Sequence, residues 1–211
     1  MTLTPSQNYA RTKSLGKFPK TRKFAESFPF ELDPFQVEAC HALESGKGVL
    51  VAAPTGAGKT IVGEFAVDLV IGSGGKCFYT TPIKALSNQK FAELTEKYGE
   101  SKVGLLTGDT SINSEAQIVI MTTEVLRNMI YANSSTINEL KYVVMDEVHY
   151  LADKFRGAVW EEILIHLSDA VQVISLSATV SNAEEFGEWL QTVRGDTEVI
   201  VSEIRPVPLY Q

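Results

Sequence analysis

Six short apolar runs, rich in β-branched and aromatic residues, alternate along this chain with segments of helical periodicity. The apolar runs lie at residues 49–53, 76–81, 102–106, 117–123, 141–146 and 171–179. The helical segments lie at residues 34–44, 59–71, 83–98, 124–130, 158–167 and 183–190. Because the apolar runs are continuous, they favour strands that are buried on both faces. The alternation predicts an α/β fold with a mostly parallel sheet covered by helices on both faces.

A polar cluster follows each apolar run. In chain order the clusters are APTGAGKT, TPIKALSNQK, TGDTS, TTEVLRN, DEVH and SATVSN. The carboxyl ends of parallel strands meet at one edge of the sheet, where ligands of such folds bind. Helix N-caps could explain any single cluster, but the whole series predicts a functional site along that edge.

The cluster APTGAGKT at residues 53–60 lies where a strand ends and a helix begins. Gly56 and Gly58 allow the backbone N–H groups to turn inward, and the helix N-terminus adds a partial positive charge. Lys59 would contact the β- and γ-phosphates of a nucleotide, and the Thr60 hydroxyl would bind Mg²⁺. The general motif has glycine at its first position, where this chain has alanine; the alternative is a glycine-rich turn before an ordinary helix. The residues predicted to bind the triphosphate are Thr55, Gly56, Ala57, Gly58, Lys59 and Thr60.

The apolar run at residues 141–146 ends on Asp146 and is followed by Glu147 and His149. Beside a phosphate loop, Asp146 is the predicted second protein partner of Mg²⁺. Glu147 would orient or deprotonate the attacking water. The predicted cofactors are therefore ATP and Mg²⁺, and the predicted catalytic residues are Lys59, Asp146 and Glu147. The alternative is a solvated strand end, and a lone histidine such as His149 is more often structural than catalytic.

From Phe28 to the C-terminus, the order of APTGAGKT, TPIKALSNQK, DEVH and SAT resembles motifs I, Ia, II and III of the superfamily-two DExD/H-box helicases. TPIKALSNQK, RGAVWEE and EIRPVPL are similar to segments of the superkiller and exosome-cofactor type of DExH helicase, and the HelY proteins are close in pattern. The resemblance implies a RecA-like fold. It also implies an ATP-dependent RNA helicase that translocates in the 3′ to 5′ direction and unwinds.

The resemblance implies an adenine site and a coupling element. FELDPFQ is similar to the adenine-recognition segment of the family, with Phe30 packing on the base and Gln36 bonding its edge. An aromatic face and an amide suit adenine, whereas Phe30 alone would be a core phenylalanine. His149, Ser177 and Thr179 would couple nucleotide state to strand movement; the two hydroxyls could instead cap a helix or turn.

Three clusters are similar to family elements that line a groove for single-stranded nucleic acid. Hydroxyls, N–H groups at helix starts and isolated cations suit contacts to phosphate and sugar. A single lysine or arginine would more often be a solvated surface cation. The implied groove residues are Thr81, Pro82, Lys84, Gly108, Asp109, Thr123, Glu124 and Arg127. TPIKALSNQK favours RNA, with a DNA helicase as one rival and a nucleotide-dependent adaptor without unwinding activity as the other.

Charge and length suggest the domain boundaries. Residues 1–27 carry six basic residues and one acidic residue, and the remainder carries 13 basic and 25 acidic residues, a net of −12. We expect a basic, irregular extension over 1–27, a RecA-like ATP-binding domain over 28–202, and over 203–211 the start of a linker to a second RecA-like domain in a parent protein. The acidic body argues against a protein that coats nucleic acid by bulk electrostatics.

Cellular setting and independent activity are also predicted. The two cysteines suggest neither a disulfide framework nor a zinc site, so a reducing, cytoplasmic setting is expected. There is no apolar run of about 18 residues, so no membrane association is expected. In the family, arginines of the second domain reach the γ-phosphate, and such residues are worth roughly 10³ to 10⁵ in rate. The chain alone is therefore expected to hydrolyse ATP slowly and not to unwind duplexes.

Overall fold

The structure, a computed structural model, describes residues 17–148, 157–178 and 183–203 of the 211. The strands are β1 (Gly48–Ala52), β2 (Lys76–Thr81), β3 (Val103–Leu106), β4 (Ser111–Ile112), β5 (Ile118–Thr122), β6 (Leu140–Met145), β7 (Gln172–Ser177) and β8 (Thr197–Val201). The helices are α2 (Pro19–Ala25), α3 (Pro34–Glu44), α4 (Thr60–Ser73), α5 (Lys84–Tyr98), α6 (Thr123–Tyr131), α7 (Gly157–His166) and α8 (Ala183–Arg194), with a 3-10 helix, η1, at Ser135–Glu139.

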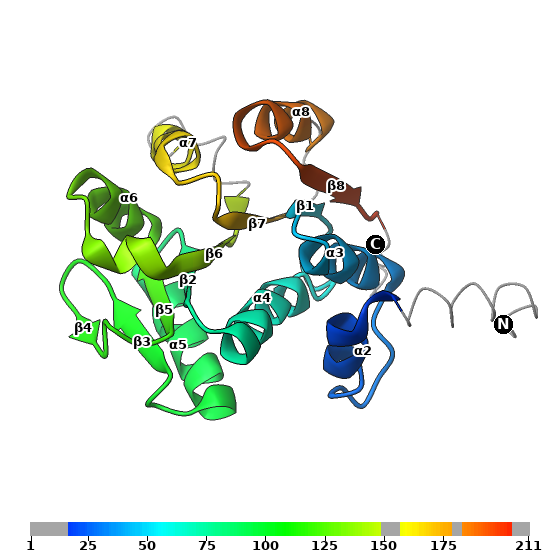
Figure 1. Cartoon of the computed structure of the whole chain (residues 1–211), viewed down its shortest axis with the longest axis horizontal. Coiled ribbons are helices and arrows are strands. Elements are labelled where there is room, and N and C mark those ends of the chain that lie inside the picture. Colours follow the sequence, from blue (N-terminus) through cyan, green and yellow to red (C-terminus); the bar gives the residue numbers. More distant parts are fainter. Residues whose placement is uncertain (1–16, 149–156, 179–182, 204–211) are drawn as a thin grey trace, which may run out of the picture.

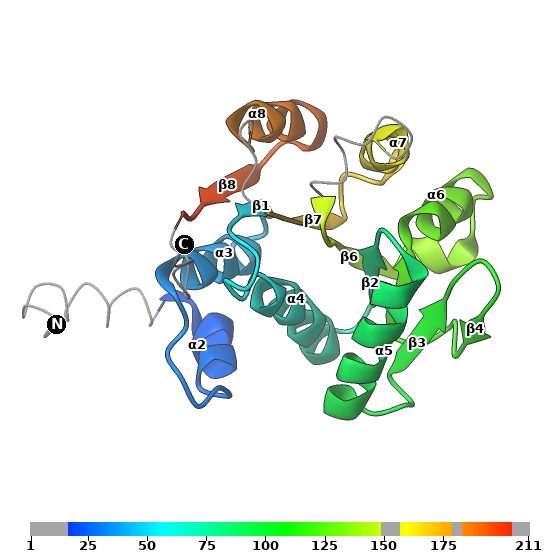
Figure 2. The same cartoon turned by 180° about the vertical axis from the view of Figure 1, so that it is seen from behind.

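All of these strands belong to one sheet, in the order β4-β3-β5-β2-β6-β7-β1-β8. Neighbouring strands run parallel except for the short β3–β4 pair, which is antiparallel. Helices α3, α4 and α5 cover one face, and α6, α7 and α8 cover the other (Figures 1 and 2). The predicted fold class is confirmed, because strands buried on both faces need a helical layer on each side.

Each face of the sheet has its own apolar core. Phe65 of α4 and Tyr79 of β2 belong to the core beneath α3, α4 and α5. Phe78 of β2 and Trp160 of α7 belong to the core beneath α6, α7 and α8. Every residue of β2 is buried, both the apolar and aromatic Cys77, Phe78 and Tyr79 and the polar Lys76, Thr80 and Thr81. The two cores hold the carboxyl ends of the central strands in fixed positions.

The prediction of an irregular extension over residues 1–27 is wrong for α2. This helix docks on α3, where the Glu44 carboxylate accepts the backbone N–H groups of Lys20 and Thr21 at 2.9 and 2.7 Å and also the Thr21 hydroxyl. Phe24 is buried against the ring of Phe65, with 5.1 Å between centroids. Tertiary contacts therefore stabilise a helix that is too short to be stable alone.

Strands β4 and β8 were not predicted. β4 has only two residues, both exposed. β8 pairs with β1 at the edge of the sheet, and only two of its five residues, Thr197 and Ile200, are buried. None of the helices in the described part of the chain is long and apolar enough to cross a membrane.

Candidate functional site

The phosphate-loop segment and the DEVH segment lie on nearby strand ends. β1 and β6 are both neighbours of β7 in the sheet. Ala52 of β1 pairs with Ser177 of β7, and the N–H of Ala53 donates to the Ser177 carbonyl at 3.1 Å. Ser177 itself is buried. The structure therefore brings the loop after β1, Ser177 and the carboxylates after β6 to one edge of the sheet.

The loop of residues 53–60 folds around the side chain of Lys59. Gly56 and Gly58 have φ values of 84° and 80°, in the left-handed region that favours glycine. The Lys59 Nζ donates to the carbonyls of Ala53 at 2.8 Å and Pro54 at 3.1 Å. Thr60 is the first residue of α4, so its hydroxyl lies at the helix start. The loop thus holds an ammonium in place, with a helix N-terminus behind it, as binding of a phosphate chain requires.

Burial lowers the pKa of the Lys59 amine below its ordinary value; the residue is only 9% exposed. The charges of Glu147 and Asp146 act on this pKa in the opposite direction. The two carboxylates therefore lie close enough to the ammonium to stabilise its charged form. The charge of Lys59 in the loop after β1 is therefore coupled to the charges of Asp146 and Glu147 after β6.

Asp146 is fixed by three hydrogen bonds. Its N–H donates to the carbonyl of Thr80 at 3.0 Å, its Oδ1 accepts the N–H of Glu147 at 2.9 Å, and its Oδ2 accepts the Tyr79 hydroxyl at 2.9 Å. Burial raises the pKa of the Asp146 carboxyl, and the bond from Tyr79 opposes that rise. Glu147 has a φ of 57°, a left-handed conformation that is strained for a residue with a side chain.

The donor set suits Mg²⁺. A carboxylate and a hydroxyl are the oxygen ligands that this ion prefers, and a magnesium ion shared with nucleotide phosphates needs only one or two protein ligands. The described residues contain no group of three or more histidines, cysteines or acids that could hold a metal. Asp146 and Thr60 therefore fit a metal shared with phosphates, rather than one enclosed by protein.

Gln36 supports the loop, a role that the sequence reasoning missed. Its Oε1 accepts the N–H of Asp33 at 2.8 Å at the start of α3, and its Nε2 donates to the carbonyl of Gly58 at 3.0 Å. A Cβ placed at Gly58 would lie 2.7 Å from this Nε2. Because Gln36 is only 3% exposed and its amide is bonded at both ends, an adenine contact by this residue would need a rearrangement. That contact stays a prediction.

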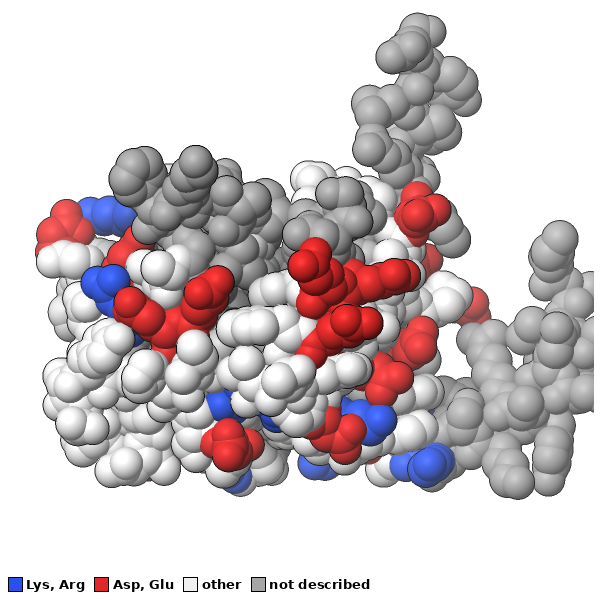
Figure 3. Space-filling model, turned by 90° about the horizontal axis from the view of Figure 1, so that it is seen from above, with Lys and Arg blue, Asp and Glu red and all other residues white. Residues whose placement is uncertain are grey.

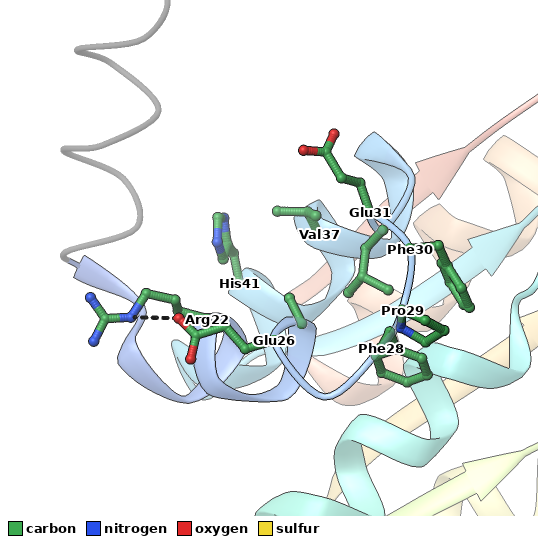
Figure 4. A pocket seen from close by; sticks show the side chains of 10 residues that line it. Arg22, Glu26, Phe28, Pro29, Phe30, Glu31, Val37 and His41 are labelled. Carbon is green, nitrogen blue, oxygen red and sulfur yellow. Dashed lines mark ion pairs between the residues drawn. The ribbon is translucent and has the colours of Figure 1, made fainter.

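Phe30 is 54% exposed, so it is not a core phenylalanine. It lines an open cavity of about 530 Å³, together with Phe28, Pro29 and His41 (Figure 4). The Phe30 and Phe28 rings lie 5.4 Å apart, and the ion pair between Arg22 and Glu26 lies across the cavity from them.

Neither Gln36 nor a residue of the phosphate loop is among the described residues that line the Phe30 cavity. The structure therefore does not bring the two predicted adenine residues to one cavity. A second cavity, of about 610 Å³, lies beside Ala57 of the loop, and its lining includes Phe35, Glu38 and residues 201–203. The sequence carried no signal for this second cavity.

The predicted groove residues lie at the ends of β2, β3 and β5, which are neighbours in the sheet. The Thr123 hydroxyl donates to the Thr81 carbonyl at 3.2 Å, and the Thr81 hydroxyl lies 2.7 Å from that of Ser87. Both threonines are buried. Their hydroxyls hold β2, α5 and α6 together, so contact of these hydroxyls with a strand would need rearrangement. The N–H groups at the nearby helix starts stay candidates.

The predicted cations of the groove are paired with acids. The Lys84 Nζ lies 2.7 Å from both carboxylate oxygens of Asp109. The Arg127 Nε lies 3.8 Å from a carboxylate oxygen of Glu162 in α7. Asp109, predicted to contact the strand, would repel a phosphate directly. In this structure it instead holds Lys84. Pro82, Gly108 and Glu124 lie in the same strand-end segments.

The outer face of α7 and α8 is acidic. Acidic side chains outnumber lysine and arginine over these two helices (Figure 3). Glu184 and Glu185 lie in the first turn of α8, and Glu161 is exposed on α7. A surface of this sign repels a phosphate backbone, so a nucleic-acid strand would bind elsewhere.

His149 and Thr179, predicted as coupling residues, lie outside the described residues.

Comparison with known proteins defines the family. The profile described as DEAD/DEAH box helicase matches residues 33–186, and the chain therefore belongs to the DEAD/DEAH box helicase family. The chain is 65% identical over 189 residues to a protein of Mycobacterium leprae named probable helicase HelY, an alignment that covers 90% of this chain and 20% of that protein. The predicted resemblance to the superkiller, exosome-cofactor and HelY type is confirmed.

Two further relatives come from eukaryotes. The antiviral helicase SKI2 of Saccharomyces cerevisiae is 50% identical over 88% of the chain and 14% of its own length. The mouse exosome RNA helicase MTR4 is 44% identical over 90% of the chain and 18% of its own length. The chain thus spans a fifth or less of these three relatives.

A solved structure shares the fold. It is described as the DUF1998 helicase MrfA bound to DNA and AMPPNP, and it superposes with a TM-score of 0.72 over 89% of this chain and 29% of that one. The sequence identity is 23%, so this likeness concerns the fold alone.

Proposed function

We propose that this chain is the ATP-binding domain of an ATP-dependent DExH-box RNA helicase that translocates in the 3′ to 5′ direction. The observation that carries the proposal is the meeting of Lys59, Asp146 and Ser177 at one edge of the sheet, inside a DEAD/DEAH box helicase domain. A nucleotide-dependent adaptor is less well supported, because such proteins usually lack the catalytic lysine and acids that this chain retains.

The geometry supports a division of work among four side chains. Phosphate oxygens would replace the loop carbonyls as partners of the Lys59 ammonium, while the loop N–H groups bind the rest of the phosphate chain. Thr60 and Asp146 would hold Mg²⁺, which when bound supplies positive charge to the β- and γ-phosphates. Glu147, the residue that follows Asp146, would orient the attacking water and accept its proton.

RNA is the proposed strand. Relatives at 44 to 51% identity include proteins named as RNA helicases, among them the chloroplastic DExH15 of Arabidopsis thaliana and the mouse MTR4. The MrfA structure is described as bound to DNA, which keeps a DNA helicase as the second candidate. Backbone contacts position a strand without identifying it, so the choice needs an experiment.

The proposed parent protein has a second RecA-like domain beyond a linker at residues 203–211. Support comes from the relatives, which are at least about five times as long as the aligned part of this chain. Residues 204–211 lie outside the described part of the structure. Because the second domain would supply the arginines at the γ-phosphate, the 211-residue chain alone is expected to turn over slowly.

ATP hydrolysis by the parent protein is expected to rise more with single-stranded RNA than with DNA of the same sequence and length. The measurement is the steady-state ATPase rate as a function of strand concentration, at one fixed salt concentration because phosphate contacts are salt-dependent. Stronger stimulation by DNA would favour the second candidate. A parent protein with no ATPase activity on either strand would contradict the proposal.

Replacement of Lys84 with alanine is expected to weaken RNA binding by the parent protein and to reduce the slope of log K against log salt by about one unit, as loss of one phosphate contact does. The measurement is fluorescence anisotropy of labelled RNA over a salt series. Lys141→Ala is the matched control, because this exposed lysine lies near the amino end of β6, at the opposite edge of the sheet. Equal slopes for the wild type and Lys84→Ala would show that Lys84 makes no phosphate contact in the groove.

A further inference from the structure

Tyr79 makes a contact with the DEVH segment that the proposed mechanism leaves unused. It lies in β2, with its side chain fully buried in the core beneath α4, and it pairs in register with Val144 of β6. Its hydroxyl donates to Asp146 Oδ2 at 2.9 Å. The other oxygen of this carboxylate accepts the N–H of Glu147. Each oxygen therefore has one protein donor, and together these donors define the plane of the carboxylate.

The ring of Tyr79 is held on several sides. A Cβ placed at Gly63 in α4 would lie 3.1 Å from Tyr79 Cε2 and 3.0 Å from Val144 Cγ1, so glycine lets the ring lie against the helix that follows the phosphate loop. The Lys90 Nζ of α5 lies 5.6 Å from the ring centroid, within the range of a cation–π contact. These contacts with α4, α5 and β6 constrain the ring and therefore the position of its hydroxyl.

This arrangement connects the two halves of the nucleotide site through a rigid group. α4 starts at Thr60, and Asp146 is the other predicted partner of Mg²⁺. Tyr79 lies between the backbone of α4 and the carboxylate of Asp146. Groups that orient a metal ligand commonly set the affinity of the site, and their loss typically costs 10- to 100-fold.

We propose that Tyr79 is a positioning residue, whose hydroxyl fixes the Asp146 carboxylate in the orientation that receives Mg²⁺ at the nucleotide phosphates. This inference rests on the proposed function. The competing explanation is that Tyr79 is an ordinary core tyrosine and that Asp146 serves only as a hydrogen-bond partner for its buried hydroxyl. The two explanations differ in what the hydroxyl does for metal-dependent binding.

The test is a Mg²⁺ titration of the 211-residue chain with a fluorescent, non-hydrolysable ATP analogue, repeated in EDTA. Tyr79→Phe is expected to raise the Mg²⁺ concentration for half-maximal binding about 10-fold. Affinity in EDTA is expected to stay unchanged. Tyr98→Phe is the matched control, because its hydroxyl is also buried but has no hydrogen-bond partner among the described residues; it is expected to titrate like the wild type.

The same substitution made in an Asp146→Ala variant tests whether Tyr79 acts through Asp146. In Asp146→Ala, the further change Tyr79→Phe is expected to leave the Mg²⁺ requirement where Asp146→Ala alone puts it, because the two residues act as one unit. Additive effects would overturn the proposal. So would an unchanged Mg²⁺ requirement in Tyr79→Phe, or an equal loss of binding in EDTA, and neither result would affect the proposed function. Absence of nucleotide binding by the wild-type chain would overturn the proposed function, and this inference with it.

Discussion

Replacement of Lys59 with alanine is expected to raise the dissociation constant for ATP about 100-fold. Two charge-assisted bonds from the ammonium to phosphate oxygens contribute about 3 kcal/mol together, and each 1.4 kcal/mol corresponds to about a factor of ten. The free protein holds this ammonium on two loop carbonyls, at 2.8 and 3.1 Å, so little ordering is needed when phosphates replace them. The measurement is a titration with labelled ATP.

Lys76→Ala is the matched control for Lys59→Ala. Lys76 is similarly buried, but it lies at the amino end of β2 and pairs with Glu115 at 2.8 Å. Its loss is expected to lower the free energy of unfolding and to leave the affinity for ATP unchanged, because it is far from the loop edge of the sheet. Wild-type affinity in Lys59→Ala would mean that the loop does not bind phosphates.

Replacement of Glu147 with glutamine is expected to lower ATP turnover by the parent protein about 10²- to 10⁴-fold, the usual contribution of a positioned general base. ATP binding is expected to persist, because glutamine keeps the shape of the side chain. The amide cannot accept a proton from water, so the effect should fall on the chemical step. The measurements are single-turnover hydrolysis and the dissociation constant for ATP in the same preparation.

Glu96→Gln, at an exposed position on α5, is the control for the loss of one negative charge. It is expected to behave like the wild type in both assays. Unchanged turnover in Glu147→Gln would show that another group positions the water. If the dissociation constant rose in parallel with the loss of turnover, Glu147 would contribute to binding instead.

The central sheet was predictable because its strands are buried on both faces. β2 is the clearest case, since all six of its residues are buried and its sequence KCFYTT shows no alternation between apolar and charged residues. α2 was not predictable, because its stability comes from Glu44 and Phe65, which are distant in sequence. β8 was missed for a different reason: it is an edge strand in which only two of five residues are buried, so it lacks the longer apolar run of the central strands.

In the candidate site, the sequence predicted which residues gather but not how they are bonded. The order of the polar clusters was enough to predict that Lys59 and Asp146 lie on the same edge. The bond from Gln36 to the loop and the bond from Tyr79 to Asp146 join residues 22 and 67 positions apart. No local pattern specifies such partners, because they depend on how strands and helices pack. The same holds for Lys84, whose pairing with Asp109 depends on the order of strands in the sheet.

The left-handed backbone of Glu147 has a consequence for how this domain can evolve. A non-glycine residue in this conformation costs about 1 kcal/mol or more, which glycine would avoid. Selection for stability alone would therefore favour replacement of Glu147, while selection for turnover would oppose it. Under the proposed function, glycine at this position would relieve the strain but remove the carboxylate that positions the water, so stability and turnover make opposite demands on this residue.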